Sequence, residues 1–374
     1  MSDEPELRRD PVTGRWVVIA PERARRPIAF SDHAPRHRTS GENRPCPFCA
    51  GAEAETPHEV YAIRDPNSTP NAAGWQLRVV PNMYPAVRPN ATATASVNSP
   101  GPMSGMLRGA SDEGGEGQRP PRGAPDEFPL FNVAPAAGFA EVLIDCPDHI
   151  DDPTKLTDDQ FADVFIAYRE RMIALSADPR LAHVSVFKNV GAEAGASLAH
   201  THSQIIATPI VPELLRTELT GAEVYTARYS RCVFCDLIEK DLAERSRVVA
   251  RSAHFVALTA FAPRFAYEMW VLPIAHEARY ESLSDTAATE LAILLKQVLR
   301  ALDQVQNAPA YNWFVHTTPL HAGEPAHYHW HLEILPRTAR PAGLEWGYGC
   351  HITTVAPEHA ATQLRSALTD VATM

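Results

Sequence analysis

The stretch Ser197-Leu-Ala-His200-Thr-His202-Ser-Gln204-Ile-Ile-Ala-Thr-Pro209 carries the strongest signal in the chain. Side chains of an extended strand alternate between its two faces, so His200, His202 and Gln204 are expected on one face. Two imidazoles and an amide side by side form a polar row that needs partners such as a phosphate, a metal or a substrate. A surface strand with incidental histidines is the alternative, and this triplet alone leaves the two interpretations about even.

A second histidine row, His327-Tyr-His329-Trp-His331, favours the functional interpretation. The segments before the two rows follow the same order, and each series opens with a C-x-x-C pair: Cys46-Pro-Phe-Cys49 in the first and Cys232-Val-Phe-Cys235 in the second. The chain is therefore interpreted as an internal duplication, with one repeat at residues 1–212 and the other at 213–374.

Each repeat is expected to contain several strands and one long helix. The first helix is predicted from Leu156 to about Ala177, with Thr157 and Gln160 as a capping box, and the second from Leu283 to about Gln304. Antiparallel strands with one helix per repeat favour an α+β fold of two antiparallel sheets over a doubly wound parallel sheet. Residues 90–136 are rich in small and polar residues and are predicted to be a disordered insertion or a long surface loop.

Length and composition limit the function classes. The chain has 374 residues, about right for two domains, with 45% hydrophobic and 21% charged residues. A net charge of −11 argues against a nucleic-acid partner. The apolar runs are too short for a membrane span, and the acidic N-terminus contains no secretion signal. We therefore expect a soluble cytoplasmic protein.

The two C-x-x-C pairs predict zinc, in one or two sites. In a reducing compartment such pairs are metal clips more often than disulfides, and zinc requires four Cys or His ligands in a tetrahedron. Buried structural thiols are the alternative. The predicted ligands are Cys46, Cys49, His149 and His200 for the first site, and Cys232, Cys235, His254 and His316 for the second.

If His200 binds metal, His202 stays free on the same face of the strand. A neutral imidazole held rigidly beside a metal-bound neighbour suits nucleophilic attack at phosphorus. Gln204 and Ser197 are candidate donors to phosphate oxygens, on which charge develops during such an attack. The basic cluster from Arg23 to Arg26 is either a phosphate clamp or a solvated loop.

At this point the chain resembles the galactose-1-phosphate uridylyltransferase family, a branch of the histidine-triad superfamily. The likeness covers nearly the whole chain except about 90–136. It is carried by the segments Asp10 to Arg26, Cys46-Pro-Phe-Cys49, Val80-Pro-Asn82-Met-Tyr-Pro85, Cys146-Pro-Asp-His149, Phe187-Lys-Asn189-Val-Gly191, Gly195 to Gln204 and Phe265-Ala-Tyr-Glu268, and by His316 and His329.

The resemblance implies a duplicated histidine-triad fold and a ping-pong reaction. His202 would attack the α-phosphorus of UDP-glucose and release glucose 1-phosphate, and galactose 1-phosphate would then take the uridylyl group. Cys46, Cys49, His149 and His200 would form a structural zinc site, and the protein would be a homodimer. Residues that would contact the phosphates are Gln204, Ser197, Asn189, Arg23 and Arg26, with Asn82 near the nucleotide.

Two departures resemble a relative, the ADP-glucose phosphorylase type, which transfers adenylyl to phosphate. Well-known uridylyltransferases have His-Pro-His-Gly-Gln where this chain has His200-Thr-His202-Ser-Gln204, and their second metal site uses a carboxylate and histidines. Adenylyl transfer through the same histidine is therefore the alternative function. A second alternative is a non-catalytic zinc-containing nucleotide-binding protein. The sequence leaves open whether His327, His329 and His331 line a second metal site, a partner's active site, or neither.

Overall fold

The structure, a computed structural model, describes residues 5–25, 46–89 and 133–371. The predicted insertion at 90–136 lies outside these residues except for its last four positions, and Arg26 lies outside them as well.

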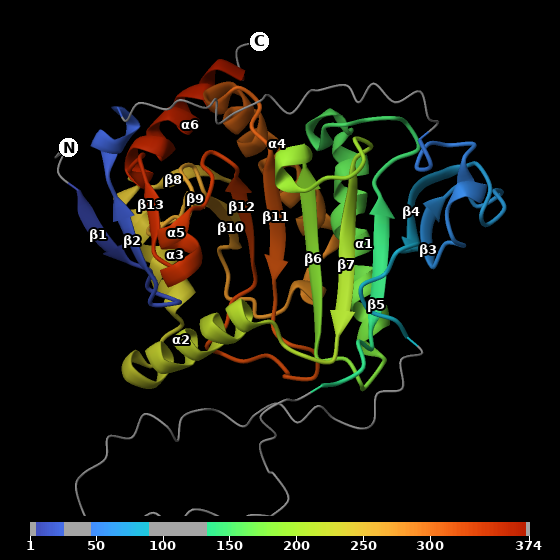
Figure 1. The fold of residues 1–374 in the computed structure, drawn as a ribbon, viewed down its shortest axis with the longest axis horizontal. Coiled ribbons are helices and arrows are strands. Elements are labelled where there is room, and N and C mark those ends of the chain that lie inside the picture. The colour runs from blue at the N-terminus through green and yellow to red at the C-terminus, as the bar shows by residue number, and fades with distance from the viewer. Residues whose placement is uncertain (1–4, 26–45, 90–132, 372–374) are drawn as a thin grey trace, which may run out of the picture.

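The centre of the fold is a ten-stranded sheet whose order is β3-β4-β5-β7-β6-β11-β12-β10-β9-β8 (Figure 1). Neighbouring strands pair antiparallel throughout. The strands are β3 (Tyr61–Arg64), β4 (Trp75–Pro81), β5 (Phe139–Ile144), β6 (His183–Val190), β7 (His202–Thr208), β8 (Val248–Arg251), β9 (Phe255–Thr259), β10 (Met269–Pro273), β11 (Tyr311–His316) and β12 (His331–Pro336).

The sheet displays the duplication. The first five strands in its order come from the first repeat and the last five from the second, and the halves meet where β6 pairs with β11. Phe187 lies opposite Phe314 at the centre of this ladder. The α+β class and the antiparallel strands are thus confirmed, and the two predicted sheets join edge to edge.

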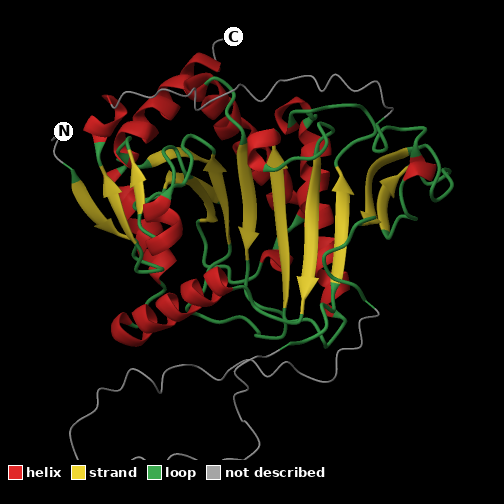
Figure 2. Ribbon diagram, viewed as in Figure 1, coloured by secondary structure: helices red, strands yellow, loops and turns green. Residues whose placement is uncertain are grey.

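One long helix from each half covers one face of the sheet (Figure 2). These helices are α1 (Asp158–Ser176) and α4 (Asp285–Gln306), which also pack on each other. The predicted capping box is confirmed: the Thr157 side chain accepts from the Gln160 amide, and the Gln160 side chain accepts from the Thr157 amide. Ser284 caps α4 through the Ala287 amide.

The remaining elements surround the second half. Helices α2 (Glu213–Tyr229) and α3 (Val233–Glu244) form a smaller core with β9 and β10. Strands β1 (Glu6–Arg9), β2 (Trp16–Ile19) and β13 (His351–Thr353) form a three-stranded sheet, so the start of the chain pairs with its C-terminal part. Helices α5 (Gly343–Tyr348) and α6 (Pro357–Val371) complete the fold; 3-10 helices span Pro21–Arg25, Glu53–Glu55, Pro153–Lys155, Ala192–Ala194 and Tyr280–Ser282.

Helix α2 approaches the first turn of the chain closely. A Cβ atom added at Gly221 would lie 1.8 Å from the carbonyl oxygen of Val12. That turn is held by Asp10, whose Oδ1 accepts from the backbone amides of Val12 and Thr13. Within the described residues, no helix has the length and apolarity needed to cross a bilayer. The division of the chain at residue 212 stays a prediction.

Candidate active site and metal centres

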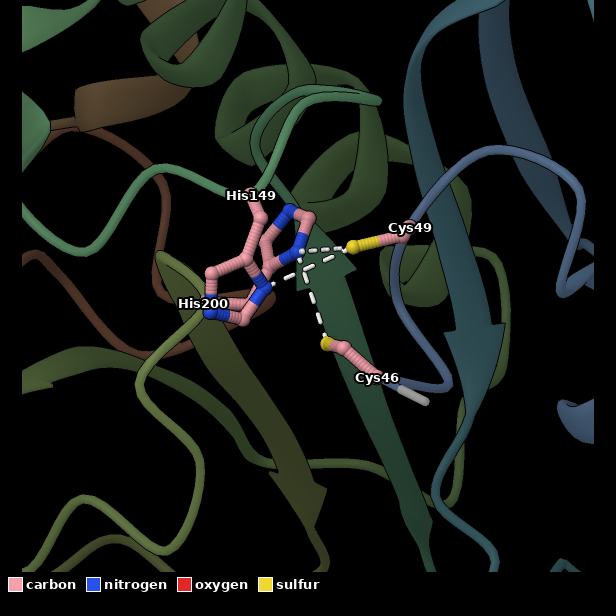
Figure 3. A group of neighbouring side chains, drawn as sticks. All are labelled: Cys46, Cys49, His149 and His200. Atoms are coloured by element: carbon pink, nitrogen blue, oxygen red, sulfur yellow. Dashed lines mark hydrogen bonds between the residues drawn. The ribbon is translucent and has the colours of Figure 1, made fainter. Parts of the chain in front are cut away.

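The four residues predicted for the first zinc site lie together (Figure 3). Cys46 and Cys49 come from one tight turn, His149 follows β5, and His200 precedes β7. The Sγ atoms of Cys46 and Cys49 each lie 3.6 Å from His200 Nδ1, and Cys49 Sγ lies 3.4 Å from His149 Nδ1. Ligands of tetrahedral zinc are roughly 3.5 Å apart when Zn–S is about 2.3 Å and Zn–N about 2.0 Å. The donor set and its spacing therefore fit zinc.

The orientation of His200 supports this assignment. Its Nε2 donates to the carbonyl oxygen of Cys146 at 2.9 Å, which turns Nδ1 toward the two sulfur atoms. The side chain is fully buried, and burial lowers the pKa of His200 to about 4. The imidazole is therefore neutral near pH 7, as a metal ligand must be.

A second cysteine–histidine cluster repeats this arrangement in the other half. It consists of Cys232, Cys235, His276 and His329. Cys235 Sγ lies 3.3 Å from His276 Nδ1 and 3.7 Å from His329 Nδ1. His329 Nε2 bonds to the Pro273 carbonyl at 2.9 Å, as His200 does to Cys146. This cluster also fits zinc in donor type and spacing.

The predicted partners of Cys232 and Cys235 are therefore corrected. His254 is exposed and pairs with Glu290, its Nδ1 lying 2.5 Å from the carboxylate. His316 lies in a different cluster, beside Glu218. The repeat itself held the correct signal, because His276 follows Glu268 as His149 follows Glu141, and His329 takes the place of His200.

The third cluster gathers Glu218 from α2, His316 from β11, and His331 and Glu333 from β12. His316 Nδ1 bonds to Glu218 at 2.7 Å, while His331 Nε2 lies 3.9 Å from Glu218 and 3.7 Å from Glu333. Two carboxylates and two imidazoles suit a divalent metal. One of the carboxylates, Glu333, already forms an ion pair with the buried guanidinium of Arg264.

Two histidines of the second row belong to these clusters. His329 belongs to the second cysteine–histidine cluster and His331 to the third, whereas His327 offers Cys232 only its backbone carbonyl. The sequence left all three open, because alternation along a strand gives the face of a side chain but not its partner.

His202, the predicted nucleophile, starts β7 and is nearly buried. Its Nδ1 lies 2.7 Å from the carbonyl oxygen of His200, to which it donates. The proton is thus placed on Nδ1, which leaves the lone pair of Nε2 for attack. Burial is the largest influence on the pKa of His202 and lowers it, so the neutral form is present at physiological pH.

The predicted donors lie on strands and loops near β7. Gln204 lies two residues beyond His202 and pairs across the ladder with Phe187 of β6. Asn189 is the next-to-last residue of the same strand. Its Nδ2 lies 3.5 Å from the Gly195 carbonyl, in the loop that carries the exposed Ser197. Asn189 therefore contacts the loop that leads into β7.

Two other predicted contacts come from different parts of the chain. Asn82 follows β4; its amide bonds to Ala140 of β5, and its side chain caps the Tyr84 amide at 2.9 Å. Arg23 is exposed in the 3-10 helix Pro21–Arg25, which continues from β2 beside the second half. Asn189 thus lies on the strand next to β7, which carries both His202 and Gln204, and the structure shows no hydrogen bond from Arg23 to β7.

The site thus combines a duplicated α+β fold with a histidine row beside a cluster of two cysteines and two histidines. Sequence models described as galactose-1-phosphate uridyl transferase, N-terminal domain and C-terminal domain, match residues 111–212 and 218–372. An ADP-glucose phosphorylase of Arabidopsis thaliana is 33% identical over 97% of this chain and 93% of its own length. The galactose-1-phosphate uridylyltransferase of Thermotoga maritima is 26% identical over 96% and 98%.

Solved structures similar to this chain come from the same two types of enzyme. An ADP-glucose phosphorylase from Arabidopsis thaliana with bound ADP-glucose has a TM-score of 0.75 and 32% identity, covering 97% of this chain and 99% of that chain. A uridylyltransferase structure has a TM-score of 0.69 and 27% identity, covering 98% and 99%. The chain therefore belongs to the galactose-1-phosphate uridylyltransferase family of nucleotidyltransferases.

Proposed function

We propose that this chain transfers the adenylyl group of ADP-glucose to phosphate, by a ping-pong reaction through His202. In the first step Nε2 of His202 attacks the α-phosphorus, the bond to the bridging oxygen breaks, and glucose 1-phosphate leaves. In the second step an oxygen of inorganic phosphate attacks the same phosphorus, the P–N bond breaks, and ADP leaves with the histidine restored.

The observation that carries this proposal is the bond from His202 Nδ1 to the His200 carbonyl. It supports an imidazole whose Nε2 is unprotonated and fixed in direction, which nucleophilic catalysis requires. Gln204, Ser197 and Asn189 are proposed as donors to the phosphate oxygens, with Asn82 nearer the nucleotide. Arg23 and Arg26 are also proposed to contact the phosphates. Arg26 lies outside the described residues.

Zinc is proposed at both cysteine–histidine clusters. Bound zinc would act structurally, because all four ligand positions of each cluster come from the protein. At the first cluster it would join the Cys46–Cys49 turn to His149 and His200. This chain's own contribution is the hydrogen bond that His202 Nδ1 donates to the backbone carbonyl of His200, which links the anchored ligand to the nucleophile.

The preference for adenylyl over uridylyl transfer has two supports. The phosphorylase relative is 33% identical and the uridylyltransferase relative 26% over a similar share of the chain. The second cluster also contains two cysteines, a feature in which the chain resembles the phosphorylase type. Uridylyl transfer from UDP-glucose to galactose 1-phosphate is the second candidate function, and it would use the same residues.

A homodimer is part of the proposal. Trp346 and Tyr348 on α5 are 78% and 84% exposed. Exposed aromatic side chains of this size supply apolar surface for an interface between subunits.

The test is the intact mass of the protein after brief incubation with ADP-glucose alone, and separately with UDP-glucose alone. We expect an adenylyl adduct that maps to His202, is discharged by phosphate, and is absent from His202→Asn. A uridylyl adduct discharged by galactose 1-phosphate would establish the second candidate instead. No adduct with either sugar nucleotide would contradict both and leave a zinc-containing nucleotide-binding protein.

A further inference from the structure

A buried polar network lies beneath the strand that carries His202. Thr201 and Ser203 flank the histidine and point to the opposite face of the sheet, where α1 packs. Thr201 Oγ1 donates to Asp145 Oδ2 at 2.7 Å. Ser203 Oγ lies 2.6 Å from the Tyr168 hydroxyl and 3.3 Å from Lys188 Nζ, and Lys188 forms an ion pair with the same carboxylate oxygen of Asp145.

The network is fully enclosed. The side chains of Lys188 and Asp145 are 1% and 0% exposed, and Tyr168 is completely buried. Burying such an ion pair carries a large desolvation cost, and well-packed apolar residues of similar volume are often as stable or more stable. Stability of the core therefore gives no sufficient reason for these charges at this place.

The second half of the chain provides an internal comparison. Lys188 lies opposite Ser203 in the β6–β7 ladder, and Val315 lies opposite Leu332 in the β11–β12 ladder. Val315 and Leu332 thus occupy the equivalent positions, and both are buried in the main apolar core. The charged and hydroxyl side chains beneath His202 are replaced by aliphatic ones beneath His331.

At two more positions a polar residue of the first half is replaced by an apolar one in the second half. Thr201 lies between the two histidines of the first row, and the residue between His329 and His331 is the buried Trp330. Tyr168 and Leu295 lie the same number of residues after their helix N-caps, and Leu295 is fully buried. The same fold thus packs an apolar core at these four places in the second half.

Asp145 has no counterpart at all. Leu143 lies opposite Ser203, and Val271 lies opposite Leu332, so these two residues are equivalent. The carbonyl that binds the first histidine of each row belongs to Cys146 in one half and to Pro273 in the other. The first half therefore contains one extra residue between these points, and this extra length places the Asp145 carboxylate beneath the strand.

We propose that Asp145 and Lys188 are positioning residues for nucleotidyl transfer, which fix the backbone on both sides of His202 and so aim its Nε2 at the phosphorus. This role rests on the proposed function. The pair holds Thr201 and Ser203 from behind, and Asp145 also donates its amide to the Thr201 carbonyl at 3.3 Å. A displacement of about 1 Å at the reacting atoms costs on the order of 100-fold in rate.

The test uses a charge-neutral double variant, Asp145→Asn with Lys188→Met. We measure the single-turnover rate of adduct formation on His202 at saturating ADP-glucose, the affinity for ADP-glucose, the zinc content and the melting temperature. We expect a rate about 100-fold lower, with affinity, zinc content and melting temperature close to those of the wild type. A purely structural pair would instead change stability and leave the rate of the folded protein unchanged.

The matched control is Asp241→Asn with Arg247→Met, which neutralises a buried ion pair of 2.7 Å in the second half. Its folded fraction should form the adduct at the wild-type rate. If the first double variant does not fold, Thr201→Val and Ser203→Ala decide the matter, since both leave the ion pair in place and should slow the step about 10-fold. Wild-type rates in the folded variants would overturn the positioning role. A wild-type protein that forms no adduct would instead overturn the proposed function, and the positioning role with it.

Discussion

His202 Nδ1 lies 2.7 Å from the carbonyl oxygen of His200, so the candidate nucleophile is bonded directly to a residue of the first cysteine–histidine cluster. In the second half His331 makes the same bond to His329, at 3.1 Å. The Nε2 of His331, however, lies between Glu218 and Glu333. The duplicated fold thus keeps the orientation of the histidine in both halves and changes what the free nitrogen faces.

The two histidines are therefore expected to respond differently to the same substitution. His202→Asn removes the attacking nitrogen and should lower the rate of adduct formation by at least about 1,000-fold. His331→Asn should leave adduct formation within about tenfold of the wild type, because its ring faces two carboxylates. Mass spectrometry after incubation with the sugar nucleotide distinguishes the two. Loss of the adduct in His331→Asn at normal zinc content would contradict this asymmetry.

The two cysteine–histidine clusters should also differ in their effect on catalysis. Cys49→Ser weakens the cluster that contains His200, so we expect one zinc fewer per chain. The rate of adduct formation should fall 10-fold to 100-fold, approximately the effect of disturbing the residues that support a metal site. Cys235→Ser should also remove one zinc and lower the melting temperature, because structural zinc contributes folding free energy. Its rate should stay near that of the wild type. Equal losses of rate in the two variants would refute the distinction.

Arg264 is expected to be important for stability. Its guanidinium forms ion pairs with Glu268 and Glu333, and both carboxylates are buried. Arg264→Met leaves two buried charges without their partner, which should cost about 3–5 kcal/mol in the free energy of unfolding. Urea unfolding measures this cost. As a control, Arg180→Met removes an exposed ion pair with Asp178 and should change little. A loss below about 1 kcal/mol in Arg264→Met would show that the carboxylates find other partners.

The sequence predicted the parts of the site that its own repeats encode. All four members of the first cluster, the helix cap at Thr157 and the strand at His202 follow from spacing and local chemistry. The prediction for the second cluster is wrong in part: it names His254 and His316, whereas the repeat spacing indicates His276 and His329.

Other features carry no local signal. The joining of the halves through β6 and β11 depends on which strand edges meet, and the local pattern of either strand does not specify its partner. Lys188 and Asp145 are charged, and charged residues are almost never fully buried unless paired, so sequence alone suggests an exposed position. Their burial depends on a partner 43 positions away in the chain, which only the folded structure supplies.

The correction at His254 leads to a prediction about pH. Partial burial raises the pKa of Glu290, but hydrogen bonds from Ser252 and His254 outweigh it and lower the pKa to about 2. The bond to Glu290 raises the pKa of His254. The contribution of Glu290 to stability is present above pH 4.5 and is lost as the pH falls toward 2, since protonation removes the charge. That of His254 is fully present below pH 6.5 and is lost as the pH rises through its raised value.

His254→Gln should therefore lower the melting temperature most between pH 4.5 and 6.5, where both partners are charged in the folded protein. The difference from the wild type should shrink on either side of that window. Zinc content should be unchanged, because His254 pairs with Glu290 and stands outside the second cysteine–histidine cluster. His276→Gln is the matched comparison and should lose zinc from that cluster. Zinc lost from His254→Gln and retained in His276→Gln would restore the ligand set first expected from the sequence.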